Sequence, residues 1–170
     1  MSLKNLNALK THRLLLDKLK DKKTFQIYKK FENELNINEN FIVAVSGGPD
    51  SMALAGLLHA LNLEKGLKVF YVLVDHGIRK NSSKEALLVK KFLKKFKISL
   101  IIIKNKEKIT KNLQGKARNI RYKLLLNFCK KKKARYILTG HHSDDQIETF
   151  LIRLSRGSGV QGLSSMKINT

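Results

Sequence analysis

The sequence predicts a doubly wound α/β fold, in which helices cover both faces of a parallel sheet. Short, β-branched apolar segments alternate with longer segments whose apolar residues recur at helical spacing. Glycines and polar clusters follow several of the apolar segments, at the strand ends where folds of this class bind ligands. The 170 residues, 42% of them hydrophobic, suffice for one compact domain with a substantial core.

The N-terminal 40 residues are expected to form a helical lead-in, because apolar residues recur at roughly helical spacing from Lys10 to Leu35 without glycine or proline. The first strand is expected over Phe41–Val45, an apolar run that stops at a Ser-Gly-Gly-Pro turn. A helix should follow over Met52–Leu63, and a second strand over Lys68–Val74.

The second half of the chain repeats this alternation. The expected elements are a helix over Ser82–Phe96, a strand over Ile98–Ile103, a basic helix over Leu113–Lys132, a strand over Arg135–Thr139 and a helix that begins at Ser143. The Ser82-x-x-Glu85 and Ser143-x-x-Gln146 patterns predict capping boxes at two of these helix starts. We therefore divide the chain into the lead-in, residues 1–40, and an α/β domain, residues 41–170.

The composition favours an anionic partner. Lys and Arg number 35 against 13 acidic residues, which gives a formal charge of +22 and favours nucleic acid, although many of these lysines would also serve as solvated helix surface. One cysteine, Cys129, leaves no intramolecular disulfide and no CxxC pair, which is typical of a cytoplasmic protein. No apolar run reaches the roughly 18 residues of a membrane span, so no membrane partner is expected.

The segment Ser46-Gly-Gly-Pro-Asp-Ser51 connects the first strand to its helix. Glycines let the backbone approach a ligand closely, and the N–H groups at a helix start bind phosphate oxygens. Pro49 should hold Gly48 in an extended conformation and so preset the turn. The segment contains neither GxxxxGK[ST] nor GxGxxG, which excludes a Walker A loop and a dinucleotide-binding fingerprint.

Carboxylates gather in the strand-end motifs of this basic chain. Five of the 13 acidic residues belong to them: Asp50, Asp75, Asp144, Asp145 and Glu148. Such a cluster needs a counter-cation, for which magnesium and an ammonium group both qualify. Helix-dipole stabilisation is the alternative for Asp144 and Asp145, but it leaves Glu148 unexplained. A zinc site at His141-His142 is not favoured, because no HxxxH pair or further cysteine accompanies it.

SGGPDS resembles the pyrophosphate-binding (PP) loop of the N-type ATP pyrophosphatases, which have an adenine nucleotide alpha hydrolase-like fold and split ATP between its α- and β-phosphates. The resemblance implies that Ser46, Gly47, Gly48, Pro49 and Ser51 hold the pyrophosphate. It also implies that Asp50 binds Mg²⁺ and takes part in catalysis.

Three further segments extend the resemblance over roughly residues 41–166. Val74-Asp-His-Gly-Ile-Arg79 resembles a segment near the nucleotide, which implies cofactor contacts for Asp75, His76 and Arg79. The block from Leu138 through Met166 is similar to the signature of the tRNA(Ile)-lysidine synthetases, and it adds Gly140 and His141 to the nucleotide site and Asp145 and Glu148 to catalysis. Residues 112–122 resemble the family's arginine-containing segment, which implies that Arg118, and also Arg121, face phosphates.

The resemblance implies an AMP-forming carbon–nitrogen ligase that acts on tRNA. ATP would adenylate C2 of the wobble cytidine in a CAU-anticodon tRNA(Ile), and the ε-amine of L-lysine would then displace AMP. Asp145 and Glu148 would orient the lysine ammonium group, although Asp144 competes with Asp145 for this role. A homodimer is considered as the assembly. Members of this family continue well beyond the length of this sequence, so we expect the chain to be a truncated form.

Two other functions remain as alternatives. A related tRNA-thiolating adenylase would share the ATP loop, but its chemistry needs cysteines that carry sulfur or bind a cluster, and this chain has only Cys129. A non-catalytic RNA-binding module would use only the basic surface, and its binding would weaken steeply with salt.

Overall fold

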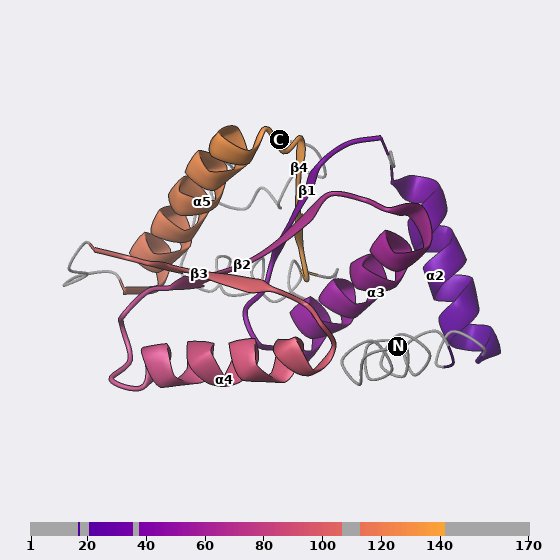
Figure 1. Cartoon of the computed structure of the whole chain (residues 1–170). Coiled ribbons are helices and arrows are strands. Elements are labelled where there is room, and N and C mark those ends of the chain that lie inside the picture. The colour runs from indigo at the N-terminus through magenta and orange to yellow at the C-terminus, as the bar shows by residue number, and fades with distance from the viewer. Residues whose placement is uncertain (1–16, 18–20, 36–37, 107–112, 142–170) are drawn as a thin grey trace, which may run out of the picture. The chain divides into compact units, whose positions relative to one another are not determined.

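The structure is a computed structural model that describes residues 17, 21–35, 38–106 and 113–141. Its described elements are α2 (Lys22–Glu34), β1 (Phe41–Ala44), α3 (Pro49–Lys65), β2 (Val69–Asp75), α4 (Ser82–Lys95), β3 (Leu100–Lys104), α5 (Leu113–Lys132) and β4 (Tyr136–Thr139). Figure 1 shows their arrangement. The helix and capping box predicted at Ser143 lie outside the described residues.

The four strands form one parallel sheet in the order β3-β2-β1-β4. The chain moves from β1 through β2 to β3 on one side, and then returns to place β4 on the other side of β1. This reversal creates a switch point between β1 and β4, and ligands of open parallel sheets bind beside such a point, beyond the carboxyl ends of the strands. The predicted doubly wound α/β fold is confirmed.

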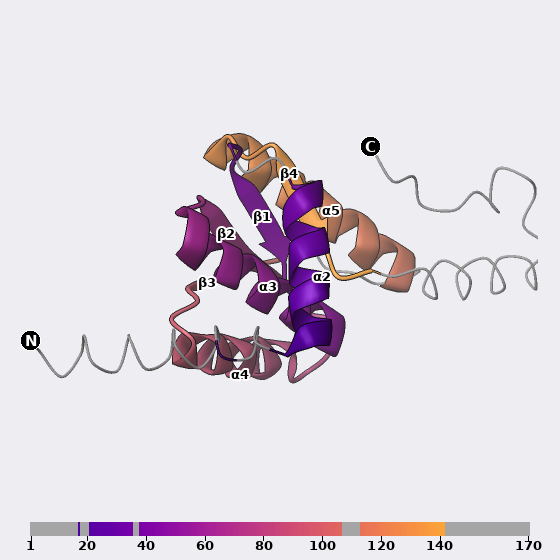
Figure 2. The same ribbon diagram turned by 90° about the vertical axis from the view of Figure 1, so that its right-hand side faces the viewer.

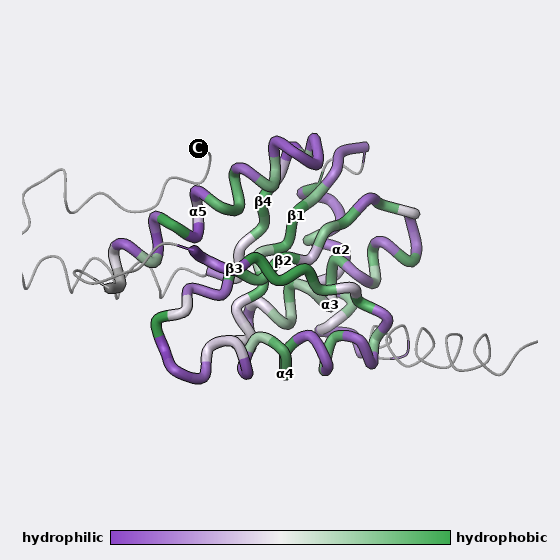
Figure 3. The backbone as a smooth tube through the Cα atoms, turned by 60° about the vertical axis from the view of Figure 1, so that its left-hand side comes forward, coloured by the Kyte–Doolittle hydropathy of each residue, from purple (hydrophilic) through white to green (hydrophobic). Residues whose placement is uncertain are grey.

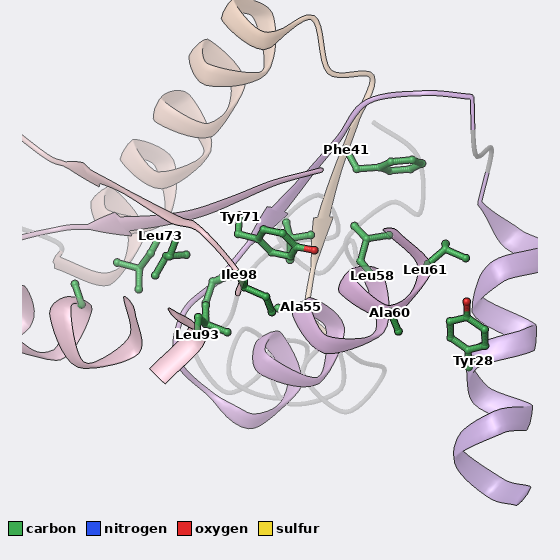
Figure 4. Packing of buried hydrophobic residues seen from close by; sticks show 14 residues of the cluster. Tyr28, Phe41, Ala55, Leu58, Ala60, Leu61, Tyr71, Leu73, Leu93 and Ile98 are labelled. Atoms are coloured by element: carbon green, nitrogen blue, oxygen red, sulfur yellow. The ribbon is translucent and has the colours of Figure 1, made fainter. Parts of the chain in front are cut away.

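Helices cover both faces of the sheet. On one face, α3 packs against β1 and β2, and α4 packs against β2 and β3. The core cluster on this face contains Phe41 and Val43 of β1 and Tyr28 of α2 (Figure 4). On the other face, Leu125 of α5 packs against Ile42. Successive residues of a strand point to opposite faces, so burial on both sides explains why β1 is apolar without interruption. Figures 1 and 2 show α5 across the sheet from α3 and α4.

Helix α2 is attached to the sheet through α3. It begins after Asp21, whose carboxylate accepts a hydrogen bond of 2.9 Å from the Thr24 backbone N–H. The Tyr28 hydroxyl donates to the carboxylate of Glu64, and Lys65 Nζ lies 3.0 Å from a carboxylate oxygen of Glu32. α2 therefore lies within the compact unit that extends to Gly140.

The predicted capping box at the start of α4 is wrong. The residue at the N-cap position is Asn81, which makes no side-chain capping hydrogen bond, and Ser82 is already helical. The neighbouring Ser83 hydroxyl donates instead to the carboxylate of Asp75 at 2.6 Å. The helix begins one residue earlier than a cap at Ser82 requires, and a serine that is itself helical is not placed for its oxygen to accept from the N–H groups of the first turn.

The third strand begins at Leu100, two residues later than predicted, because Ile98 takes part in the motif that ends α4. Lys97 adopts a left-handed conformation with φ 63°. The Ile98 N–H donates to the Leu93 carbonyl at 3.1 Å, and the Lys97 N–H donates to the Lys94 carbonyl at the same distance. These two bonds form a Schellman motif, in which an apolar residue just beyond the helix packs against its last turn. Ile98 is buried in this way.

Candidate functional site at the carboxyl edge of the sheet

The loop of residues 46–51 is organised around the hydroxyl of Ser51, which is buried. Ser51 Oγ donates to the Gly48 carbonyl at 3.0 Å and accepts from the Ser46 N–H at 3.1 Å and from the Ser46 hydroxyl at 3.0 Å. Gly48 is extended (φ −74°, ψ 160°), as the sequence predicted. Helix α3 begins at Pro49, however, and not at Met52 as expected, because proline is favoured at the first position of a helix. Hydrogen bonds within the loop thus hold the turn in its conformation.

The start of α3 provides the features of an anion site. The N–H groups of a first helical turn point out of the helix along its axis, and the helix dipole favours negative charge there. Asp50 lies in this first turn and is exposed. One carboxylate beside a phosphate site suits Mg²⁺, which commonly combines one or two carboxylates with substrate phosphates and water. Among the described residues, no group of three or more His, Cys, Asp or Glu forms a metal site by protein ligands alone.

Two glycines allow the neighbouring elements to approach this loop. Gly47 has φ 89°, and a Cβ atom on it would lie 2.8 Å from a methyl carbon of Val89 in α4. Gly140, directly after β4, lies even closer to the loop, since a Cβ there would be 2.6 Å from Ser51 N and 2.8 Å from Asp50 C. The end of β4 therefore rests on the first turn of α3, at the switch point.

Asp75 ends β2 and is buried. Its carboxylate accepts from the Gly77 N–H at 3.1 Å and from the Ser83 hydroxyl at 2.6 Å. Burial raises the pKa of Asp75, but hydrogen bonds from Ser83, Ser82 and Gly77, with the positive charge of Lys104, outweigh this effect and bring the pKa below its ordinary value. The contacts of Asp75 are thus with the β2–α4 turn, which it holds in place.

His76 follows Asp75 and is partly buried. Its backbone carbonyl accepts from the Asn105 side chain at 3.3 Å, and its Nδ1 is buried without a hydrogen-bond partner among the described residues. Burial lowers the pKa of His76, the positive charge of Arg121 lowers it further, and Asp75 opposes this shift. A neutral imidazole at pH 7 follows, and this form can accept a hydrogen bond.

Arg118 and Arg121 come from the first half of α5. Their guanidinium carbons lie 5.5 and 5.8 Å from the centroid of the Tyr122 ring, which both groups face. Arg121 is also close enough to His76 to influence its titration, so α5 and the end of β2 meet at this edge. Arg79 lies on an exposed turn, with its guanidinium 3.8 Å from a carboxylate oxygen of Glu85.

The structure thus brings together part of the predicted set. The 46–51 loop meets Gly140, and His76 lies near Arg121. His141 is partly buried and begins a second compact unit, while Asp144, Asp145 and Glu148 lie outside the described residues. Sequence reasoning missed Ser83 and Asn105, which support Asp75 and His76. Asn105 follows β3 directly, and its position as a polar residue at a strand end was the available signal.

These features define a doubly wound nucleotide-binding type of domain, with a preset anion loop at its switch point. Residues 19–170 match the PP-loop domain family, and the chain belongs to this family.

Similar proteins include two named tRNA(Ile)-lysidine synthase. The one from Wolbachia pipientis wMel is 46% identical over 143 residues, covering 80% of this chain and 33% of the relative. The one from Orientia tsutsugamushi (strain Boryong) is 39% identical over 132 residues, covering 77% of this chain and 30% of the relative. The chain therefore spans about a third of the length of these curated relatives.

A solved structure, the U34-tRNA thiolase from Methanococcus maripaludis with its [4Fe-4S] cluster, resembles this chain with a TM-score of 0.63. The match covers 93% of this chain and 53% of the other, at 21% sequence identity. At this identity the likeness supports the fold alone. Within the described residues, no helix is both long and apolar enough to cross a membrane.

Proposed function

We propose that this chain is the nucleotide-activating domain of a tRNA(Ile)-lysidine synthetase. The observation that carries the proposal is the 46% identity, over 80% of the chain, to a protein named for this activity. The preset loop at the switch point supports it, since adenylation needs a site that receives the departing pyrophosphate. The enzyme would be an AMP-forming carbon–nitrogen ligase.

ATP is the proposed nucleotide, which membership of the PP-loop family supports. The backbone of Gly47 and Gly48 and the hydroxyl of Ser46 would approach its β- and γ-phosphates, and Pro49 and Ser51 would keep the loop in shape. Asp50 would hold Mg²⁺ against these phosphates, where the cation offsets charge that develops on the leaving group. The exposed position of Asp50 in the first turn of α3 suits this role.

The residues around the loop would orient the rest of the substrates. His76, as a neutral imidazole, would accept a hydrogen bond from the nucleotide, and Asp75 would keep the turn that carries His76 and Arg79 in position. Arg118 would stabilise negative charge on phosphate during catalysis, assisted by Arg121. Gly140 would let the end of β4 lie directly beside the loop.

The proposed reaction has two displacements. The C2 oxygen of the wobble cytidine in a CAU-anticodon tRNA(Ile) attacks the α-phosphorus of ATP and displaces pyrophosphate. The ε-amine of L-lysine, after losing a proton, then attacks C2 and displaces AMP together with that oxygen. Asp145 and Glu148 are the proposed partners of the lysine ammonium group, and we retain Asp144 as the alternative to Asp145.

The thiolation alternative is less well supported, because Cys129, the one cysteine of the chain, lies away from the 46–51 loop. Cys129 is in the last turns of α5, where its thiol donates to the Ala134 carbonyl at 2.8 Å. That end of α5 leads into the start of β4, so it lies at the sheet edge opposite the 46–51 loop. Burial raises the pKa of this thiol, which disfavours the reactive thiolate.

The test is transfer of labelled lysine to a tRNA(Ile) transcript with a CAU anticodon, using the 170-residue chain, ATP and magnesium. A transcript with uridine at the wobble position is the substrate control. Asp50→Asn is the matched protein control, since it preserves the shape of the side chain and removes its charge. We expect lysine incorporation that both controls abolish. Thiouridine formation with a sulfur donor, in place of lysine transfer, would favour the thiolation alternative.

Failure of the lysine transfer has two distinguishable meanings. If ATP with magnesium still protects the chain from thermal unfolding and Asp50→Asn removes the magnesium-dependent part of that protection, the nucleotide site is correct and the chain is an incomplete synthetase. If the chain binds the transcript but ATP gives no protection, the lysidine proposal is overturned and the RNA-binding alternative is favoured. The salt dependence of binding then measures how many phosphates the basic surface contacts.

A further inference from the structure

Helix α4 carries apolar residues on two faces, although only one of them packs against other residues that the structure describes. Ala86 and Leu93 are buried against the sheet, and Val89 packs between them. On the outward side, Leu87 and Leu88 are 60% and 66% exposed. Figure 3 shows hydrophobic and hydrophilic residues alternating along α4. Single exposed leucines are common, whereas adjacent ones on a helix that already has a buried face call for an explanation.

Phe92 extends this apolar surface by one helical turn. This residue is 47% exposed. The centroid of its ring lies 5.3 Å from the centroid of the Phe96 ring and 6.0 Å from Lys95 Nζ. Residues four apart on a helix are neighbours, so Leu88 and Phe92 form one continuous strip, flanked by Leu87. We name these three residues the outer strip of α4.

Lysines surround the outer strip. α4 contains five lysines and one glutamate, and Glu85 lies near Arg79. Helical spacing places Lys84, Lys91 and Lys95 on the same side as Leu88. The outward side of α4 therefore combines apolar contact area with concentrated positive charge.

These two properties together select the class of partner. A second copy of the chain would bring the same lysines face to face, and its charge of +22 opposes such a dimer. RNA would pair with the lysines, but it would gain little from the leucines. Proteins bind single-stranded RNA by stacking its bases on aromatic rings, which leucine side chains lack. A helix that presents an apolar face bordered by carboxylates would complement both the strip and its lysines.

We propose that the outward side of α4 is a docking surface for an acidic, amphipathic protein helix. Leu87, Leu88 and Phe92 would receive the apolar side chains of that helix, and the surrounding lysines would pair with its carboxylates. The surface lies outside the nucleotide site and is independent of the reaction proposed above. Partners of this kind are recognised through apolar residues three and four positions apart.

The test uses a fluorescent 18-residue peptide with leucines on one helical face and glutamates elsewhere, and measures its anisotropy with the full chain at physiological salt. Leu88→Ser with Phe92→Ser should weaken binding at least about tenfold, because residues at the centre of an interface contribute most of its affinity. Leu126→Ser is the matched control, since Leu126 is 52% exposed on α5, and should leave binding unchanged. Circular dichroism verifies that each variant is folded.

Two further comparisons separate this surface from general attraction to a basic protein. A scrambled peptide of the same composition should bind at least about tenfold more weakly, because it retains the charge and loses the apolar face. Lys91→Glu should weaken binding of the acidic peptide and favour a peptide with lysines in place of glutamates. Equal binding of the scrambled peptide, or an unchanged affinity of the Leu88→Ser, Phe92→Ser variant, overturns the proposal. The proposal is also overturned if the acidic peptide does not bind, while phosphatidylserine vesicles or single-stranded RNA bind in a way that depends on the outer strip.

Discussion

Gly140 occupies a position at which even a methyl group does not fit. Its missing Cβ would lie 2.6 Å from the backbone nitrogen of Ser51 and 2.8 Å from Asp50 C, and backbone atoms of a helix start cannot move aside as a flexible side chain can. From the sequence, Gly140 was assigned to nucleotide binding. The structure adds a steric reason for glycine there: it lets β4 end against the anion loop.

Gly140→Ala should therefore disturb the loop and the fold together. We expect a loss of about 1–3 kcal/mol in the free energy of unfolding, typical of overpacking, and weaker ATP binding. Gly56→Ala is the matched control, because a Cβ at that position in α3 meets nothing within 4 Å and should gain up to about 1 kcal/mol from helix propensity. Urea titration and calorimetric ATP binding measure both effects, and equal stability of the two variants would refute the close approach.

His76 should make stability depend on pH in a defined window. Its pKa is lowered in the folded protein from 6.5, so the unfolded chain binds the proton first as the pH falls. The free energy of unfolding therefore decreases from about pH 6.5 downward, and this decrease stops once folded His76 is also protonated. His76→Gln should flatten the curve between about pH 7 and 5. Thermal unfolding across this pH range measures the effect. The same dependence of stability on pH in the original chain and in the His76→Gln variant would exclude a lowered pKa for His76.

The residue scale also shows where sequence reasoning ends. The strand-end position of Asp75 and His76 was predicted, because a strand and its end can be recognised from local pattern. The partners of Asp75 could not be assigned, since Ser83 had been interpreted as part of a helix start and its hydrogen bond depends on how the β2–α4 turn folds back. Burial and long-range contact are set by packing, which a single sequence pattern does not encode.

At the scale of elements, α4 and α5 end in the same way. Lys133 has φ 50°, the Ala134 N–H donates to the Cys129 carbonyl at 3.0 Å, and the Lys133 N–H donates to the Lys130 carbonyl at 3.2 Å. This is the Schellman motif seen at Lys97, with lysine at a position where glycine is preferred. α3 ends instead at Gly66, which is left-handed without the steric penalty of a Cβ.

Lys133→Gly should therefore stabilise the chain. A side chain in the left-handed conformation costs about 1–2 kcal/mol, and the extra freedom of glycine in the unfolded chain offsets about 0.5–1 kcal/mol of the gain. We expect a net increase of about 0.5–1 kcal/mol in unfolding free energy, visible as a rise of a few degrees in Tm. Lys131→Gly, inside α5, should instead lose about 1 kcal/mol. A lower Tm for Lys133→Gly would contradict this account.

Elements were easier to predict than their ends. The apolar runs of β1 and β2 and the apolar spacing of α5 are local features, and the strands and helix they predicted are present. The start of β3 was misplaced because Ile98 is as apolar as a strand residue, although its N–H closes the end of α4. A buried apolar residue beside a helix end fits either element, and only the backbone conformation of Lys97 distinguishes them.

At the scale of the whole molecule, the fold assembles the candidate site from distant segments. The 46–51 loop and Gly140 are separated by about ninety residues of sequence, yet the parallel pairing of β1 with β4 brings them into contact. Their common location at the carboxyl edge followed from the predicted fold class alone. Which residues touch within the site did not, because that depends on strand order and on the close approach that glycine permits.

The whole chain should also report nucleotide binding through its stability. A ligand that binds only the folded state stabilises it by about 2.7 kcal/mol at one hundred times its dissociation constant, so ATP with magnesium should raise Tm. Asp50→Asn should remove the part of this rise that requires magnesium and leave the part due to ATP alone. Because one charge in a chain of +22 changes little in its overall field, binding of a tRNA transcript and its steep salt dependence should persist. If Asp50→Asn also abolishes the increase in Tm with ATP in the absence of magnesium, the carboxylate is needed for the shape of the loop. If the magnesium-dependent increase in Tm survives, another group holds the cation.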